Sequence, residues 1–148
     1  MRGLVLDFGG VLTDFGDDPG DDFGGDFGGD PGATLPPLAE VAGSLRRRGV
    51  RTAILSNADG LWAPPVEWQD LFDVVVTSGE VGFAKPDRRS YLLAAERLGL
   101  APQDCVFVDD LAVNVRGAAA AGMVGVHHRS VRSTLAELEI LLAVPLLG

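Results

Sequence analysis

The chain has little of several residue types that mark particular classes of protein. It has one cysteine, Cys105, among 148 residues, so a disulfide within the chain is impossible and a reducing compartment is expected. Cys105 lies in an apolar run and is expected to be a small buried hydrophobic residue. No segment reaches the ~18 apolar residues of a transmembrane helix, and Asp7 interrupts the apolar N-terminal stretch, unlike a signal peptide. We therefore expect a cytoplasmic protein without membrane contact.

Basic residues are also few, since 12 of them face 21 acidic residues and the net charge is −9. The excess is local, because residues 14–32 contain seven aspartates and no basic residue. The rest of the chain holds 14 acidic and 12 basic residues and is nearly neutral. Without a basic stripe to meet phosphates, a nucleic-acid partner is not expected.

Short apolar runs alternate with segments of helical periodicity along the chain. Strands are predicted at 3–7, 51–55, 73–77, 105–109 and 124–127, and helices at 35–48, 86–98, 112–121 and 131–143, with a short helix between Trp62 and Trp68. This alternation is typical of an α/β protein with a parallel sheet. We expect a three-layer, Rossmann-like parallel sheet of about five strands flanked by helices.

Residues 14–34 are of low complexity and rich in glycine, aspartate and proline. Such a tract buries too little apolar surface to offset the entropy lost on ordering it. We expect residues 1–148 to form a single core domain in which this acidic tract is a loop.

Polar residues end or follow several of the predicted strands. They are Asp7, the pair Ser56 and Asn57, Lys85, and the pair Asp109 and Asp110. The C-terminal ends of parallel strands lie at one edge of a sheet, where open α/β folds bind ligands. Three carboxylates that meet there repel one another unless a cation neutralises them, and Lys85 and a divalent cation are the candidates. Oxygen ligands without cysteine or histidine favour Mg²⁺.

The order of these motifs resembles the haloacid dehalogenase (HAD) superfamily over nearly the whole chain. Asp7-Phe8-Gly9-Gly10-Val11 is similar to its first motif, and Ile54-Leu55-Ser56-Asn57 to its second. Lys85 before Pro86 matches the third motif, and Val108-Asp109-Asp110 matches the fourth. The resemblance implies a HAD-like core and hydrolase activity, most commonly phosphatase activity.

The resemblance also implies roles for these residues. Asp7 would attack phosphorus and carry an aspartyl-phosphate, while Lys85 would steady both the nucleophile and the phosphate. Substrate contacts would come from Ser56, Asn57, Gly10 and Lys85. Mg²⁺ would be held by Asp7, the carbonyl of Gly9, Asp110 and Asp109, with Asp110 favoured over Asp109 as the direct ligand.

The sequence departs from the family pattern at Gly9. Most phosphatases of the superfamily have an aspartate there as general acid and base, and glycine has no side chain to take that role. Asp14 is the nearest spare carboxylate, although we do not expect it to replace the missing acid. Two alternatives therefore stay open: a dehalogenase-like enzyme in which Asp7 attacks carbon, and a catalytically weak module that binds Mg²⁺ or a phosphorylated partner.

The second departure is the cap, because the acidic tract at 14–34 occupies the position where many relatives insert a helical domain. A minimal or capless member has an open site, which suits a small-molecule phosphate ester, a phosphoprotein, or an oligomer in which another subunit supplies a lid.

A few other residues have two interpretations each. Asn114 could support Asp110 or lie on a helix surface. Trp62 and Trp68 are expected to pack in the core rather than form a substrate shelf. His127 and His128 are expected at the surface or satisfied in the core, although the end of their strand lies near the site.

Overall fold

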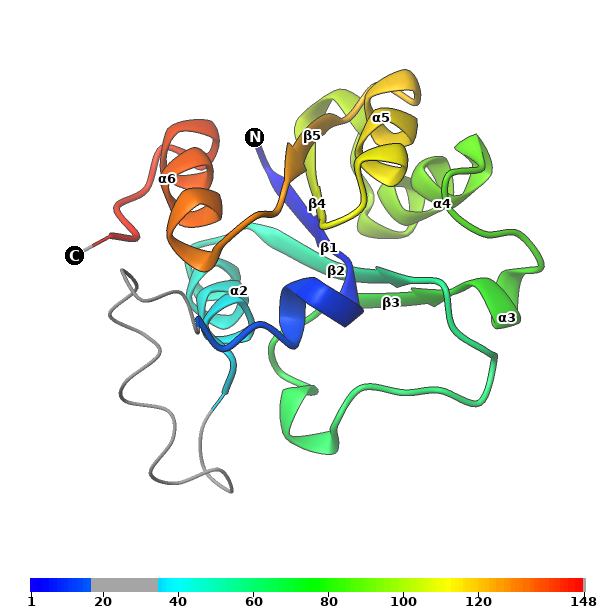
Figure 1. Ribbon diagram of the computed structural model, residues 1–148, viewed down its shortest axis with the longest axis horizontal. Helices are drawn as coiled ribbons and strands as arrows, with labels where there is room; N and C mark the ends of the chain where they lie inside the picture. The colour runs from blue at the N-terminus through cyan, green and yellow to red at the C-terminus, as the bar shows by residue number, and fades with distance from the viewer. Residues whose placement is uncertain (17–34, 148) are drawn as a thin grey trace.

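A computed structural model describes residues 1–16 and 35–147 of the chain. Within them, five parallel strands form one sheet in the order β3-β2-β1-β4-β5 (Figure 1). The strands are β1 (Gly3–Leu6), β2 (Arg51–Ser56), β3 (Val74–Thr77), β4 (Cys105–Asp109) and β5 (Val124–His127). The predicted α/β class and parallel sheet are confirmed.

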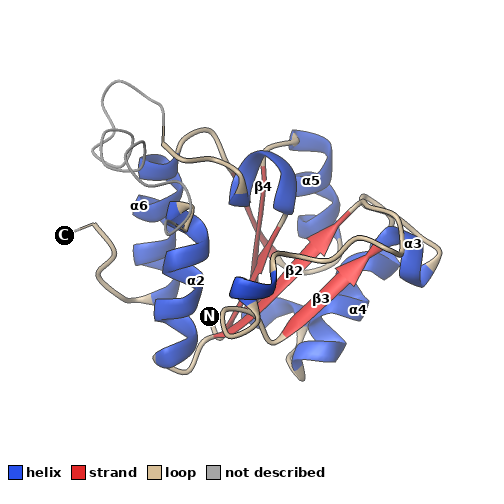
Figure 2. Ribbon diagram, turned by 90° about the horizontal axis from the view of Figure 1, so that it is seen from below, coloured by secondary structure: helices blue, strands red, loops and turns tan. Residues whose placement is uncertain are grey.

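Helices cover both faces of this sheet (Figures 1 and 2). On one face, α2 (Pro37–Arg47) and α6 (Val131–Leu142) pack against the strands through leucines of both helices. On the other face, α4 (Arg88–Leu98) and α5 (Ala112–Ala120) contribute Tyr91 and several alanines. The result is the expected three-layer arrangement.

The central strand shows why both faces are apolar. Side chains alternate along a strand, so Leu4 and Leu6 of β1 enter the core beneath α2 and α6, and Val5 enters the core beneath α4. All three residues are fully buried. Since burying such a side chain is worth about 1.5–3 kcal/mol, a strand apolar at every position is stable only between two helical layers.

The main helices begin and end within two residues of the predicted bounds. In α4, the Asp87 side chain accepts a hydrogen bond from the backbone N–H of Arg89, and Gly99 ends the helix with a φ of 73°. The predicted short helix is η2 (Val66–Trp68). The sequence did not predict η1 (Phe8–Leu12), α3 (Ser78–Val81) or η3 (Pro102–Asp104), which are too short to show a periodicity.

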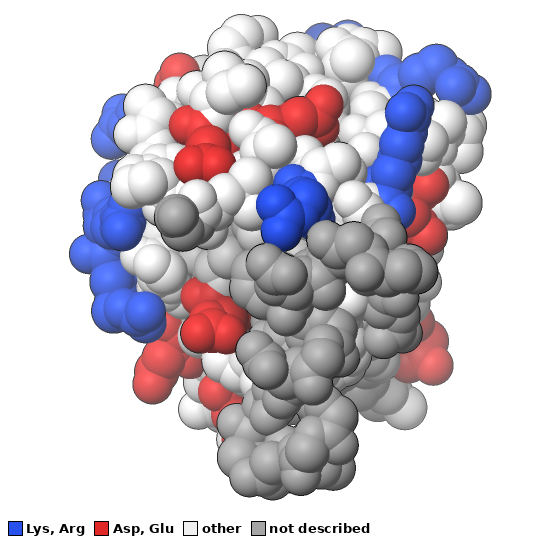
Figure 3. All heavy atoms as spheres, turned by 60° about the vertical axis from the view of Figure 1, so that its left-hand side comes forward, with Lys and Arg blue, Asp and Glu red and all other residues white. Residues whose placement is uncertain are grey.

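The acidic tract predicted as a loop at 14–34 lies outside the described residues, except for residues 14–16. The arrangement of the chain as a single domain stays a prediction. On the face seen in Figure 3, basic side chains lie at the left edge, at the upper right and near the centre, with acidic side chains among them, so this face is not of one charge. None of the helices in the described ranges is long and apolar enough to cross a membrane.

Candidate functional site

The strand register aligns the polar residues at the C-terminal edge of the sheet. Leu6 at the end of β1 pairs with Ile54 of β2 and Val108 of β4. Asp7 follows one residue later, and its backbone N–H donates to the carbonyl of Val108 at 3.0 Å. Asp7 therefore lies level with the ends of both neighbouring strands, where the chain turns into η1.

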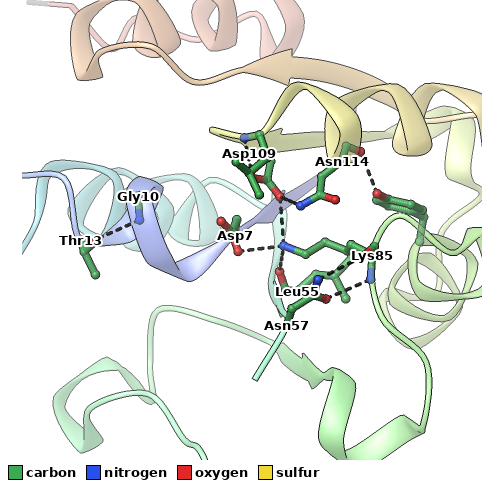
Figure 4. Close-up of polar contacts among 10 residues, drawn as sticks. Asp7, Gly10, Thr13, Leu55, Asn57, Lys85, Asp109 and Asn114 are labelled. Carbon is green, nitrogen blue, oxygen red and sulfur yellow. Dashed lines mark hydrogen bonds and ion pairs between the residues drawn. The ribbon is translucent and has the colours of Figure 1, made fainter. Parts of the chain in front are cut away.

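Lys85 reaches this edge from the loop before α4 and joins three strands. Its Nζ donates to Oδ1 of Asp7 at 2.8 Å, to Oδ2 of Asp109 at 3.0 Å and to the carbonyl of Leu55 at 2.9 Å (Figure 4). The Lys85 side chain is 1% exposed, and all three of its N–H bonds are used. The positive charge of this buried lysine lies between the carboxylates of Asp7 and Asp109 and offsets the repulsion between them.

The side chain of Asn57 forms hydrogen bonds with the backbone of Lys85. Its Oδ1 accepts the backbone N–H of Lys85 at 2.9 Å, and its Nδ2 donates to the Lys85 carbonyl at 3.1 Å. The sequence predicts that Asn57 binds substrate, but both polar atoms of its side chain are engaged with the backbone of Lys85. These contacts depend on the tertiary packing of β2 against the Lys85 loop, and the predicted contact of Asn57 with substrate stays a prediction.

Asp109 is fully buried and has most of its acceptor capacity filled. Its Oδ1 accepts the N–H of Leu111, and its Oδ2 accepts Nδ2 of Asn114 in addition to Lys85. Burial raises the pKa of Asp109, but Lys85 and these hydrogen bonds outweigh it and hold that pKa below 3.8. Both interpretations of Asn114 are corrected: it is buried, its Nδ2 donates to Asp109 rather than Asp110, and its backbone carbonyl accepts the Tyr91 hydroxyl at 2.7 Å.

Three carboxylates at this edge could hold a metal ion. One oxygen from each of Asp7, Asp109 and Asp110 lies within 4.8 Å of the others. Burial raises the pKa of Asp7 to about 6 although Lys85 lowers it, and burial also raises the pKa of Asp110. An all-oxygen donor set whose charges are only partly compensated by one lysine fits a hard divalent cation. Asp110 is exposed and the most accessible of the three carboxylates.

The two glycines after Asp7 have different surroundings. Gly10 has a φ of 83°, and a Cβ there would collide with the carboxylate of Asp110. Its N–H donates to Oγ1 of Thr13 at 2.9 Å, and its predicted contact with substrate stays a prediction. Gly9 has ordinary φ and ψ of −67° and 128°, and a Cβ there would meet no atom within 4 Å.

Ser56 closes β2 at the same edge and is 7% exposed. Its hydroxyl makes no hydrogen bond within residues 1–16 and 35–147. Its predicted contact with substrate stays a prediction.

The aromatic residues near the site pack together. Phe8 lies against Trp62 with ring centroids 4.7 Å apart, and against Trp68 at 5.7 Å. Trp68 belongs to the core and Trp62 is partly buried against it, as expected for packing residues.

The two histidines are engaged near the site. His128 is buried between Oγ1 of Thr134 at 2.7 Å and Oδ2 of Asp14 at 2.8 Å. The carboxylate of Asp14 is therefore held by His128. His127 contacts the backbone carbonyl of Asp110 through Nε2 at 3.0 Å.

The model for the family described as haloacid dehalogenase-like hydrolase matches residues 22–122, more than half of the chain. The chain belongs to this family. The predicted resemblance to HAD-like hydrolases is confirmed, and the sheet with Asp7 at the end of its central strand is the family's core.

Two curated proteins and one solved structure show how closely this HAD-like hydrolase resembles known chains. It is 43% identical over 83 residues to phosphatase MT3486 of Mycobacterium tuberculosis, covering 53% of this chain and 38% of that protein. It is 35% identical over 115 residues to mouse acyl-CoA dehydrogenase family member 10, covering 75% of this chain but 11% of that protein. The chain thus spans well under half the length of both curated relatives.

The solved structure is that of an uncharacterized protein from Corynebacterium glutamicum. It superposes on this chain with a TM-score of 0.78 at 34% sequence identity. The aligned region covers 98% of this chain and 97% of the other chain. The HAD-like core of this chain therefore matches a protein of nearly the same extent.

Proposed function

We propose that this HAD-like hydrolase is a Mg²⁺-dependent phosphatase that is transiently phosphorylated on Asp7. The observation that carries the proposal is the position of the Asp7 carboxylate, held by the Lys85 ammonium beside the carboxylates of Asp109 and Asp110. A nucleophile fixed next to positive charge and metal ligands suits attack on a phosphoryl group, whose charge must be neutralised as it reacts.

The proposed reaction uses the contacts that the chain's own residues make. The Oδ of Asp7 that does not bind Lys85 attacks phosphorus, and the bond from phosphorus to the leaving oxygen breaks. Lys85 holds the other oxygen and stabilises negative charge, while Asn57 fixes the backbone from which Lys85 extends. Water then attacks the aspartyl-phosphate, which releases phosphate and restores the carboxylate. The Ser56 hydroxyl is the donor for a phosphate oxygen.

Asp7, Asp110 and the carbonyl of Gly9 would hold the Mg²⁺ ion. Asp109 belongs to this set by proximity, but its oxygens already accept hydrogen bonds from Lys85, Asn114 and Leu111. When bound, the ion offsets repulsion between the carboxylate and the phosphoryl group and orients the latter.

The likeness to phosphatase MT3486 supports phosphate ester or phosphoprotein hydrolysis over attack on carbon. The three carboxylates support it as well, because displacement at carbon makes no use of a metal cluster.

The test measures phosphate release from a panel of phosphorylated compounds, with Mg²⁺ or EDTA, for wild type and Asp7→Asn. Turnover should require Mg²⁺ and be lost in Asp7→Asn, while the melting temperature shows that this variant is folded. Full activity of Asp7→Asn overturns the assignment of the nucleophile. Dehalogenation that survives EDTA supports attack on carbon instead, and Mg²⁺ binding without hydrolysis of any compound supports the binding module.

A further inference from the structure

Within residues 1–16 and 35–147, no side chain of the proposed phosphatase site is placed to protonate a leaving group. Gly9 lies two residues after Asp7 at the exposed edge of the site and offers neither an acid nor a base. Its backbone does not require glycine, because φ and ψ are ordinary and a Cβ would meet nothing within 4 Å. In the part of the chain that the structure describes, the position of a Cβ on Gly9 therefore faces open space.

The nearby titratable side chains that the structure describes are held elsewhere. All three N–H bonds of Lys85 point to the protein, and the carboxylate of Asp14 is bound by His128. His127 directs Nε2 to the backbone carbonyl of Asp110, which can only accept a hydrogen bond. Asp110 lies against Gly10 among the candidate metal ligands.

The absence of an acid limits which bonds such a site can break. An alcohol leaves as an alkoxide, a strong base whose conjugate acid is about as weak an acid as water. A positioned acid typically speeds this departure by about 10²–10⁴-fold. A carboxylate or phosphate leaving group has a conjugate acid of pKa about 4–6 and departs as a stable anion. Only the second kind of leaving group needs no proton from the enzyme.

We infer that this site acts on phosphoric acid anhydrides, such as acyl phosphates and pyrophosphate esters, in preference to alkyl phosphate monoesters. In the first step an Asp7 oxygen bonds to phosphorus, and the bond to the anhydride oxygen breaks with its electron pair leaving on the carboxylate or phosphate. In the second step water bonds to phosphorus, the bond to Asp7 breaks, and the water proton passes to solvent. The inference rests on the proposed function and specifies its substrate class.

The experiment varies the leaving group and restores the acid. The ratio of kcat/KM for an alkyl phosphate to kcat/KM for acetyl phosphate is measured with Mg²⁺, and 4-nitrophenyl phosphate serves as an intermediate leaving group. The enzymes are wild type, Gly9→Asp, and Gly9→Asn as a matched control of the same shape without a carboxyl group. Both side chains fit the open space at Gly9, and melting temperatures check their folding.

For wild type, kcat/KM should fall steeply as the leaving-group pKa rises. Gly9→Asp should raise the alkyl-to-acetyl ratio by about 10²–10⁴-fold, and Gly9→Asn should leave it low. A wild-type enzyme that hydrolyses alkyl phosphates as fast as acetyl phosphate overturns the inference, and so does an equal gain in Gly9→Asn. If Asp7→Asn retains the activity, or no phosphorylated compound is hydrolysed, the proposed function itself fails.

Discussion

At the scale of single residues, the Lys85 side chain connects Asp7, Leu55 and Asp109 at the edge of the sheet. It is the only lysine of the chain, whose other eleven basic residues are arginines. Its compact ammonium fits among two carboxylates and a carbonyl, where a planar guanidinium would need more space and a different geometry. A sequence with one lysine, placed before a proline between two predicted elements, indicates a specific role for that lysine.

Gly10 is the other residue whose identity the structure explains directly. Its φ of 83° disfavours any side chain, and a Cβ would collide with the carboxylate of Asp110. Gly49 also has a positive φ, 94°, but has open space around it and lies at the end of α2, away from the site. Comparing an alanine substitution at each of these two glycines separates the effect of a strained backbone from the effect of displacing Asp110.

Gly10→Ala is expected to weaken Mg²⁺ binding by about 10-fold, since the added Cβ would meet the Asp110 carboxylate and displace this ligand from the metal site. Gly49→Ala should cost a similar ~1 kcal/mol of stability from the positive φ but leave Mg²⁺ affinity unchanged. Calorimetric titration with Mg²⁺ and thermal melts measure both effects. Equal Mg²⁺ affinity in Gly10→Ala and wild type would contradict the contact with Asp110.

At the scale of elements, short polar contacts decide how helices, strands and loops meet. Asp73, just before β3, accepts the N–H of Thr52 in β2 and Nε of Arg46 in α2, both at 2.9 Å. Partial burial raises the pKa of Asp73, but the Thr52 N–H and Arg46 lower it more, so the result is below 3.8. One carboxylate thus joins α2, β2 and β3 at the edge of the sheet opposite the site.

Asp73→Asn should lower the free energy of unfolding at pH 7 by about 1 kcal/mol, because it removes the charge from a partly exposed ion pair while keeping an acceptor. A carboxyl with a depressed folded pKa stabilises the fold above its unfolded pKa. The difference between variant and wild type should therefore shrink as the pH falls below 3.8 and through the folded value.

Denaturation as a function of pH measures this effect, with Asp70→Asn as the matched control. The Asp70 side chain makes no hydrogen bond to other described residues, so that variant should match wild type at every pH. A Tm difference for Asp73→Asn that persists unchanged into acid would show that the charge of Asp73 is not the cause.

At the scale of the whole molecule, the core buries Cys105 completely at the start of β4. Burial, with a smaller effect of the Asp104 charge, raises the pKa of this thiol to about 11. Since the thiolate is the reactive form, the native protein should react with a thiol reagent at neutral pH only through unfolding, at least about 10³-fold more slowly than the unfolded chain.

The measurement compares the rate of Cys105 modification in buffer and in denaturant, with one thiol per chain as the end point. A native protein that reacts as fast as the unfolded chain would contradict the buried position of Cys105. Because β4 is an interior strand of the sheet, the rate also reports the global stability of the fold.

The amino-acid sequence by itself determined the order of the helices and strands and the edge of the sheet at which the site lies. Apolar runs of strand length alternate with helical periodicities, and such patterns need no knowledge of contacts. Asp7, Ser56 and Asp109 each come at the end of a run or just after it, so a parallel sheet necessarily brings them to one edge.

Only the tertiary structure decided which polar atoms are used and which are left free. The direction of a side chain depends on neighbours far along the chain, which is why Asn57 turned out to hold Lys85 and Asn114 to hold Asp109. The same holds for the two glycines after Asp7: Gly10 lies against Asp110, while Gly9 faces open space. Residue types and periodicity specify the sheet, but the packing of distant segments specifies the chemistry at its edge.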